Sequence, residues 1–289
     1  MEEKDNLIKF GGVIINYSSF SRRRLWAFIL VTLVLLTIAF YISGIIGGNG
    51  DLKIIIAGSF LTIGVLVVLF YCSKVYKGIP TLIGLGKVRD LKKFFIGLSI
   101  PVILFVLTLF IGLATGLIKD VHLKLDSVIW IGFLINILGT FLFEAFPEEV
   151  MFRGFILTEL KKKYRFISSL VLHIIIFCAV AVFAALLSGL LANDISFNIL
   201  RNIPQYILFV IALQLYKAYT QSIWVTMFFH LFHLEIAKYV LTHDNLSILS
   251  FGEMYTGVFE VVGMTIFYLG SIAILGILLT INRYRSKNK

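Results

Sequence analysis

Residues Leu25–Ile46 read LWAFILVTLVLLTIAFYISGII, an apolar run without a single charged side chain. A run of about 20 apolar residues is long enough for an α-helix to cross the hydrocarbon core of a bilayer. Only helices and closed barrels span that core, because no water satisfies the backbone there. This run is continuous rather than alternating, so it predicts a helix. It follows the charged stretch SFSRRRLW and is long enough to span, so we expect a retained first helix rather than a cleaved signal.

The composition of the whole chain agrees with a membrane protein. Of its 289 residues, 59% are hydrophobic and only 15% are charged, and the mean hydropathy is +0.97. A soluble domain of this length could not cover its surface with so few charges. The net charge of +10 does not indicate nucleic-acid binding, because the basic residues are scattered along the chain. We expect membrane lipids and a membrane-associated peptide or protein as partners, and no nucleic acid.

The same criterion of length and hydropathy gives eight candidate spans: 25–46, 54–73, 94–118, 128–147, 167–191, 203–219, 221–241 and 257–281. With both termini in the cytoplasm, 21 of the 26 Lys and Arg residues fall on the cytoplasmic side, as the positive-inside rule requires. The predicted fold class is therefore an all-α polytopic transmembrane helix bundle of about eight spans with both termini cytoplasmic. The predicted parts are an N-terminal arm (1–24), a membrane domain (25–282) and a basic tail (283–289), with a loop at 74–93.

The stretch FEAFPEEVMFRG, at 143–154, places unusual charge at the end of the fourth span. Pro147 suits the first turn of a helix, and Glu148 and Glu149 would then lie where the helix dipole favours anions. Glu149 and Arg153 are four residues apart and can pair on one helix face. Glu144 and Glu148 have the same spacing, but two like charges repel there unless one is protonated or a cationic group lies between them.

Two interpretations of this cluster are open on local chemistry alone. The first is ordinary helix capping at the cytoplasmic interface, with Arg153 opening a basic loop. The second is that buried carboxylates hold a metal or activate water. A charged side chain at the centre of a membrane helix costs about 2.5–3.5 kcal/mol on insertion scales, so such residues are functional candidates by default.

The stretch PEEVMFRGFILTEL, at 147–160, resembles the first signature of the CAAX-protease and bacteriocin-processing family of intramembrane metalloproteases. That signature is Glu-Glu-x-x-x-Arg followed by Gly. The resemblance implies that Glu148 is the base that activates water, and that Arg153 orients Glu149.

A second stretch, TQSIWVTMFFHLFHLEIAKYV at 220–240, resembles the third signature of the same family. His230 matches its histidine. The family has Asn four residues later, where this chain has Leu234. His233 lies one turn after His230 on the same helix face and could supply the missing polar group. A structural hydrogen bond to a neighbouring helix is the alternative for His233.

The second signature, Phe-x-x-x-His, lacks its histidine. In SSLVLHIIIFCAVAVFAALLSG, at 168–189, Phe177 takes the Phe position and Ala181 the His position. The frame that begins at Phe183 also lacks a histidine. His173 lies eight residues before Ala181, about 12 Å along a helix, and could serve only if the site were rebuilt.

The remaining histidines and the cysteines are expected to play no part in the site. His122 and His243 fall in outside loops, and Cys72 and Cys178 lie in apolar runs as free small hydrophobic residues. The resemblance implies a divalent metal such as zinc, with His230 and His233 as its ligands. Two ligands alone make a weak zinc site.

Two functions from different classes follow. One is a glutamate-dependent intramembrane endopeptidase that acts on membrane-associated peptides, with Glu148, Glu149, Arg153 and His230 at a site in the cytoplasmic half of the bundle. The other is a non-cutting relative that serves as a membrane scaffold, a partner-binding protein or a bacteriocin-immunity protein. A transporter is a distant third. We expect a bacterial plasma membrane, and a separation of about 3–6 Å, one water's reach, between Glu148 and His230 in the enzyme.

Overall fold

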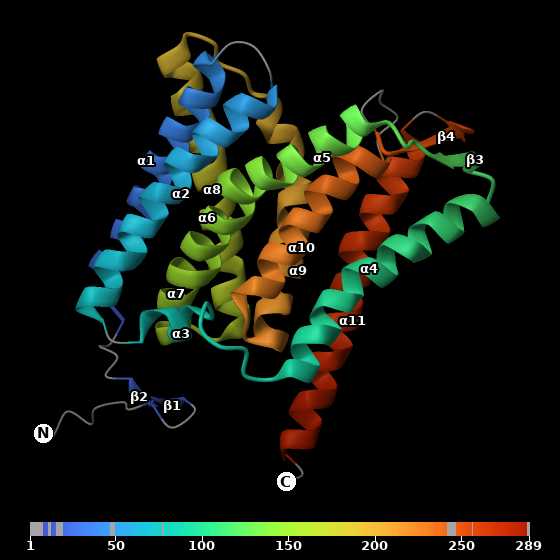
Figure 1. Ribbon diagram of the computed structural model, residues 1–289. Helices are drawn as coiled ribbons and strands as arrows, with labels where there is room; N and C mark the ends of the chain where they lie inside the picture. The colour runs from blue at the N-terminus through green and yellow to red at the C-terminus, as the bar shows by residue number, and fades with distance from the viewer. Residues whose placement is uncertain are drawn as a thin grey trace, which may run out of the picture.

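A computed structural model gives the fold and describes residues 8–10, 13–15, 20–46, 50–76, 78–241, 247–255 and 257–287. Figure 1 shows a bundle of long helices. The α-helices are α1 (Arg22–Ile45), α2 (Gly50–Val75), α3 (Ile79–Ile83), α4 (Leu91–Ala114), α5 (Ser127–Thr140), α6 (Phe146–Glu148), α7 (Leu157–Lys163), α8 (Phe166–Ala192), α9 (Ile203–Thr220), α10 (Ile223–Ile236) and α11 (Val258–Lys287). The π-helical segments are η1 (Phe141–Ala145), η2 (Glu149–Ile156) and η4 (Ala237–Leu241), and η3 (Asn198–Asn202) is a 3₁₀-helix.

Within the described ranges, seven helical segments are long and apolar enough to cross a membrane. The helix α10 has only 14 residues, but η4 continues it to Leu241. The expected break between the sixth and seventh spans lies where α9 ends at Thr220, and Gln221 adopts a left-handed conformation with φ 57°. The predicted all-α membrane bundle is therefore confirmed. The start of α1 and the end of α11 lie at the same end of the bundle, which Figure 1 shows at the bottom.

The fourth span is longer than expected. Instead of ending at residue 147, it continues as one helical segment from Ser127 to Lys163. The expectation that a helix begins at Pro147 is wrong, because Pro147 lies inside this continuous run. A proline removes a backbone donor from a helix interior. Here it lies between two π-helical segments, in which the backbone bonds skip an extra residue, and such segments are frequent at functional sites.

The segments outside the bundle are short. Two antiparallel strand pairs are present, β1 (Ile8–Phe10) with β2 (Val13–Ile15) and β3 (Ile118–Leu123) with β4 (Leu249–Glu253). The predicted loop at 74–93 contains the short helix α3, which two left-handed glycines flank. Helix α1 begins before residue 25 and α11 continues past residue 282, so both helices extend beyond the predicted limits of the membrane domain.

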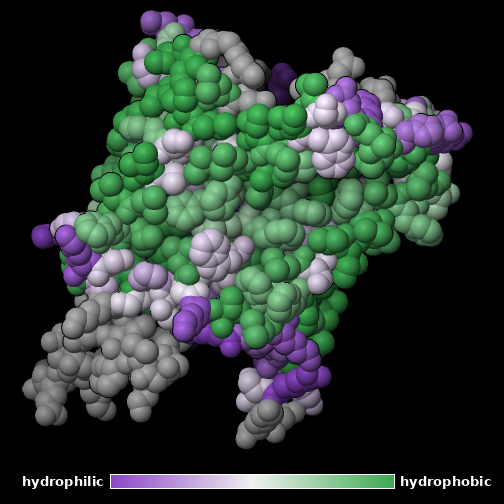
Figure 2. Space-filling view, viewed as in Figure 1, coloured by the Kyte–Doolittle hydropathy of each residue, from purple (hydrophilic) through white to green (hydrophobic). Residues whose placement is uncertain are grey.

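The surface of the bundle is apolar over a broad band. Figure 2 shows green hydrophobic residues across its middle and hydrophilic residues toward its two ends. Large side chains on this band are well exposed, among them Phe110 at 66% and Val67 at 61%. In water such a surface would aggregate, and a lipid bilayer is the solvent that fits it.

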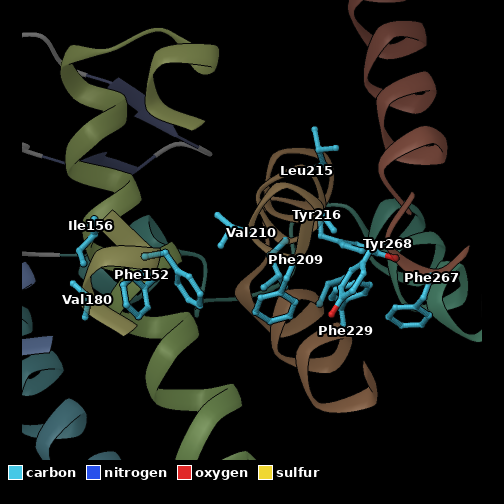
Figure 3. Close-up of a cluster of buried hydrophobic side chains, with 14 of the residues drawn as sticks. Phe152, Ile156, Val180, Phe209, Val210, Leu215, Tyr216, Phe229, Phe267 and Tyr268 are labelled. Carbon is cyan, nitrogen blue, oxygen red and sulfur yellow. The ribbon is translucent and has the colours of Figure 1, made fainter. Parts of the chain in front are cut away.

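Aromatic side chains fill the centre of the bundle (Figure 3). The ring of Phe229 packs against Tyr216, Phe267 and Phe209, with centroids 4.6, 4.9 and 6.3 Å away. These rings join α9, α10 and α11. Offset and tilted ring pairs of this kind add about 0.5–1.5 kcal/mol each beyond their buried area. The cluster gives a rigid base on which polar residues can be held.

Candidate active site

The long fourth span carries the three carboxylates of the site. Glu144 lies in η1, Glu148 ends α6 and Glu149 begins η2. Glu144 and Glu148 line a cavity, whereas Glu149 is fully buried in the protein. The adjacent residues Glu148 and Glu149 therefore lie in different surroundings, the first at the cavity and the second in the protein interior.

Glu149 links the first and third signature stretches. Its Oε1 lies 3.1 Å from Arg153 Nη1 and accepts a hydrogen bond of 3.1 Å from His230 Nδ1. The pairing of Glu149 with Arg153 on one helix face is thus confirmed. Because Nδ1 is the donor to the carboxylate, Nε2 of His230 is the ring nitrogen left for the cavity. A carboxylate that holds an imidazole in this way fixes both its tautomer and its orientation.

Arg153 is enclosed by aromatic rings as well as paired. It has no exposed surface, and its guanidinium carbon lies 4.9 Å from the ring centroid of Phe177 and 5.5 Å from that of Phe209. Cation–π contacts of this kind strengthen when they are shielded from water. Arg153 is therefore not a cytoplasmic loop residue that opens a basic segment, as the capping interpretation requires.

The cavity has a volume of about 310 Å³. Its lining comprises Phe40, Glu144, Glu148, Phe177, Ala181, Ile199, Asn202, Gln205, Tyr206, Phe209, His230, His233, Leu234 and Tyr268. Nε2 of His230 lies 3.9 Å from Glu144 Oε2, and His230 also interacts electrostatically with Glu148. Glu144 and Glu148 are four residues apart on one helix face, and this spacing called for a cationic group between them. The imidazole of His230, which can carry a positive charge, lies beside both carboxylates.

The two positions at which this chain departs from the family signatures also line the cavity. Ala181 stands where the second signature has His, and Leu234 stands where the third has Asn. Both side chains face the space that Glu148 and His230 share. The signature alignment therefore places these residues at the wall of the cavity, and the wall is apolar there.

Other polar residues of the lining were not predicted. The hydroxyl of Tyr268 lies 2.6 Å from His233 Nε2, and Gln205 Nε2 donates to the same hydroxyl at 3.1 Å. Since Gln205 donates to the Tyr268 oxygen, the hydroxyl proton is free to be donated to His233. A polar side chain within an apolar span is a functional candidate, so this rule alone could have identified Gln205 and Tyr268.

The other histidines lie away from the cavity or outside the described residues. His173 is fully buried and donates from Nε2 to the carbonyl oxygen of Phe152 at 3.1 Å, in the π-helical segment η2. It does not line the cavity, so it does not replace the missing histidine. His122 is an exposed residue of β3. His243 lies outside the described residues.

A zinc centre does not fit the side chains that surround the cavity. Within the part of the chain that the structure describes, no three His, Cys, Asp or Glu residues are grouped so that they could hold a metal ion. Nε2 of His233 is bonded to Tyr268, whereas Nε2 of His230 is open to the cavity, so the count of available ligands is what argues against zinc. The chemistry of the site is therefore derived below from side chains and water.

The cavity lies in the half of the bundle away from the chain ends, not in the half expected from the sequence. Phe40 is near the end of α1, and Gln205 and Tyr206 are near the beginning of α9. The expectation placed the site toward the cytoplasmic half, which in the predicted topology holds both termini, and which end of the bundle is cytoplasmic stays a prediction.

Comparison with known proteins identifies one family. Residues 130–233 match the family of type II CAAX prenyl endopeptidase Rce1-like proteins. The match includes the carboxylate cluster, Ala181, His230 and His233, and it confirms the resemblance drawn from the signatures. No curated protein and no solved structure matches the chain.

Proposed function

We propose that this multi-pass membrane protein is a glutamate-dependent intramembrane endopeptidase, because its residues 130–233 match the type II CAAX prenyl endopeptidase Rce1-like family. Its substrates are membrane-associated peptides, and its location is the plasma membrane of a bacterium. One observation supports the proposal above the others. Glu148 and His230 line the same cavity, and His230 is held there by the buried Glu149.

In this mechanism Glu148 acts as the general base. Its carboxylate takes a proton from a water molecule in the cavity while the water oxygen attacks the carbonyl carbon of the peptide bond. The carbonyl oxygen becomes an oxyanion, and the proton on Glu148 passes to the leaving nitrogen as the carbon–nitrogen bond breaks. Charge that develops on the carbonyl oxygen needs a donor, and a protonated His230 Nε2 facing the cavity supplies one.

Glu149 and Arg153 are positioning residues in this proposal. Glu149 touches His230 and not the cavity, and Arg153 touches Glu149. The chain Arg153, Glu149 and His230 keeps the imidazole in one orientation. Removing such a supporting partner typically lowers the activity of a site about 10- to 100-fold.

The alternative is a relative that keeps the fold without cutting. The observation in its favour is the apolar wall at Ala181 and Leu234, where the family signatures carry His and Asn. A protein of this kind would hold a membrane partner in the cavity, as a scaffold or a bacteriocin-immunity protein.

Cleavage by purified protein in lipid vesicles tests the proposal, with a set of membrane-associated peptides that includes prenylated ones. We expect cleavage by the unmodified chain and its loss in both Glu148→Gln and His230→Ala. The matched control is Glu260→Gln in the first turn of α11, which lies outside the cavity lining and should retain activity.

A different result of the same cleavage experiment would identify the non-cutting alternative. If the unmodified chain cuts none of the peptides, whereas the double variant Ala181→His with Leu234→Asn does cut, the apolar wall accounts for the lost activity. The proposal of an active enzyme is then wrong, and the scaffold role replaces it.

A further inference from the structure

The cavity is open toward one end of the bundle and closed toward the other. On α9 and α10, the side chains that follow the lining residues toward the closed end are packed without space. On α9, Gln205 and Tyr206 line the cavity, whereas Leu213 and Tyr216, further along, have no exposed surface. On α10, His233 and Leu234 line it, whereas Val225 and Phe229 are fully buried.

On α8 and α11 the side chains toward the closed end are packed as well, and here Ala184 and Phe259, toward the other end, are also buried. On α8, Ala181 lines the cavity and His173, two turns earlier, is fully buried. On α11, Tyr268 lines it and Leu275, two turns later, is fully buried. Figure 3 shows the lining residues Phe209 and Tyr268 in one cluster with the buried residues Phe152 and Phe229, and we call this cluster the floor of the cavity. A peptide therefore cannot reach the carboxylates through the floor without unpacking the core.

The mouth of the cavity lies at the connection between α8 and α9. Asn202 and Gln205 line the cavity and are exposed at the same time. This connection lies at the end of the bundle away from the start of α1 and the end of α11, at the top of Figure 1. The entrance and the helix ends nearest the chain termini are thus on opposite sides of the membrane.

The distribution of basic residues identifies the sides. Arg22, Arg23, Lys161, Lys162 and Lys163 lie at the closed end, in the first turn of α1 and the last turn of α7. The same end holds the start of α4 with Lys92 and Lys93 and the end of α11 with Arg283 and Arg285. Lys and Arg gather in the cytoplasmic segments of membrane proteins. The closed end is therefore the cytoplasmic one. Arg153 is buried and is not one of these basic residues at the end of the bundle.

The charge of the lining restricts what can enter. Glu144 and Glu148 are carboxylates, and none of the described lining side chains is Lys or Arg. Of the cations that act on these carboxylates, Arg153 is shielded by Phe177 and Phe209 and paired with Glu149. Lys238, which acts on Glu144, donates a hydrogen bond to Asn136 outside the lining. A free C-terminal carboxylate would find no Lys or Arg in the lining and would meet two carboxylates beside His230, whereas the ammonium or guanidinium of a basic peptide would be attracted.

We propose that the cavity receives its substrate from the non-cytoplasmic side of the membrane, and that this substrate is a peptide segment with positive charge exposed at the outer face. The assignment of the occupant as a substrate rests on the proposed endopeptidase function. The side of entry and the charge preference rest on the cavity alone, so they can be tested without cleavage.

Cysteine modification in intact cells tests both parts. In a chain whose two free cysteines, Cys72 and Cys178, are replaced by Ala, we introduce Ala181→Cys at the cavity wall. The control is Lys92→Cys, an exposed position at the start of α4 near the closed end. The probes are two membrane-impermeant methanethiosulfonates, one with a trimethylammonium group and one with a sulfonate group.

We expect modification of Ala181→Cys in intact cells and modification of Lys92→Cys only after the membrane is opened. The ratio of the rates for the cationic and the anionic probe at Ala181→Cys should exceed that at Lys92→Cys by about tenfold or more. Adding Glu144→Gln and Glu148→Gln to Ala181→Cys should remove the excess.

Three results overturn the inference. These are modification of Ala181→Cys only in opened membranes, its absence even there, and modification of Lys92→Cys in intact cells. An equal probe ratio at the two positions refutes the charge preference. The proposed endopeptidase function is tested separately, by peptide cleavage. If Ala181→Cys is labelled in intact cells but no peptide is cleaved, the cavity is an outward-facing binding site. If peptides are cleaved but Ala181→Cys is labelled only in opened membranes, the protein is an enzyme that acts on cytoplasmic peptides.

Discussion

At the scale of single residues, the centre of the molecule is the buried ion pair of Glu149 and Arg153. Both side chains have no exposed surface, and the pair is separated from water by Phe177 and Phe209. Burying two charges is costly, and the attraction between them offsets that cost only while both partners are present. The pair is therefore a sensitive point for the stability of the protein.

Removing one partner should destabilise the fold strongly. Arg153→Ala leaves the Glu149 carboxylate buried without its cation, and we expect a loss of about 3–5 kcal/mol in the free energy of unfolding. Thermal unfolding of the detergent-solubilised protein measures this. The double variant Arg153→Met with Glu149→Gln has no buried charge at this point and should recover most of the loss. Equal stability of the single and double variants would contradict the account.

The hydroxyl of Tyr268 is a second residue-scale test. Tyr268→Phe removes the contacts to His233 and Gln205, and we expect a loss of about 1–3 kcal/mol because His233 Nε2 is left buried without a partner. Tyr284→Phe on the same helix is the matched control, since Tyr284 is 70% exposed and should show no change. A stability of Tyr268→Phe equal to that of the control would mean that this hydrogen bond contributes nothing.

At the scale of elements, the π-helical segments explain why the fourth span can carry the site. An α-helix would continue its regular bonds through Pro147, which has no N–H to donate. The π-helical η1 and η2 lie on either side of this proline and widen the helix. In η2 the carbonyl of Phe152 accepts from the backbone N–H of Leu157, five residues on, and also from His173. The local geometry and the contacts of the site are thus coupled.

Close packing of α2 against η1 should hold the carboxylate segment in place. A methyl group on Gly58 would lie 2.8 Å from the backbone nitrogen of Phe143, and the hydroxyl of Thr62 donates to the Leu142 carbonyl one turn on. Gly58→Ala therefore has to push α2 and η1 apart, and we expect a loss of about 1–3 kcal/mol, as for other overpacked sites.

The matched control for Gly58→Ala is Gly132→Ala in α5, where nothing lies within 4 Å of the added methyl group. Ala is the better helix former, so Gly132→Ala should leave the unfolding temperature unchanged or raise it. Peptide cleavage should fall in Gly58→Ala, because Glu144 and Glu148 move with η1. A Gly58→Ala protein as stable and as active as Gly132→Ala would show that the two elements separate freely.

At the scale of the whole molecule, hydropathy predicted most of the architecture. The expected spans 25–46 and 94–118 lie within a few residues of α1 and α4, because length and apolar composition decide whether a segment can cross a bilayer. The pairing of Glu149 with Arg153 followed from their spacing on one helix face. The contact of Glu149 with His230 joins residues 81 positions apart, which no local pattern encodes.

The parts that could not be predicted depend on how helices pack. The side on which the cavity opens depends on where small and large side chains meet between the helices. Hydropathy carries no information about that packing. The polar pair of Tyr268 and Gln205 was visible in the sequence as polar residues in apolar spans, but no motif marked them.

The response to metal removal distinguishes side-chain chemistry from metal chemistry in the molecule as a whole. Since no three His, Cys, Asp or Glu residues in the described part of the chain are grouped so that they could hold a metal ion, we expect peptide cleavage not to depend on a divalent ion. We expect cleavage in vesicles to continue after treatment with a strong zinc chelator, within about twofold of the untreated rate. A variant that inserts the second-signature histidine, Ala181→His, adds a third imidazole to the cavity and serves as the comparison, because three ligands suffice for zinc. Loss of cleavage by the unmodified chain on chelation, with recovery when zinc is returned, would place a metal at the site and reject water activation by Glu148 and His230 alone.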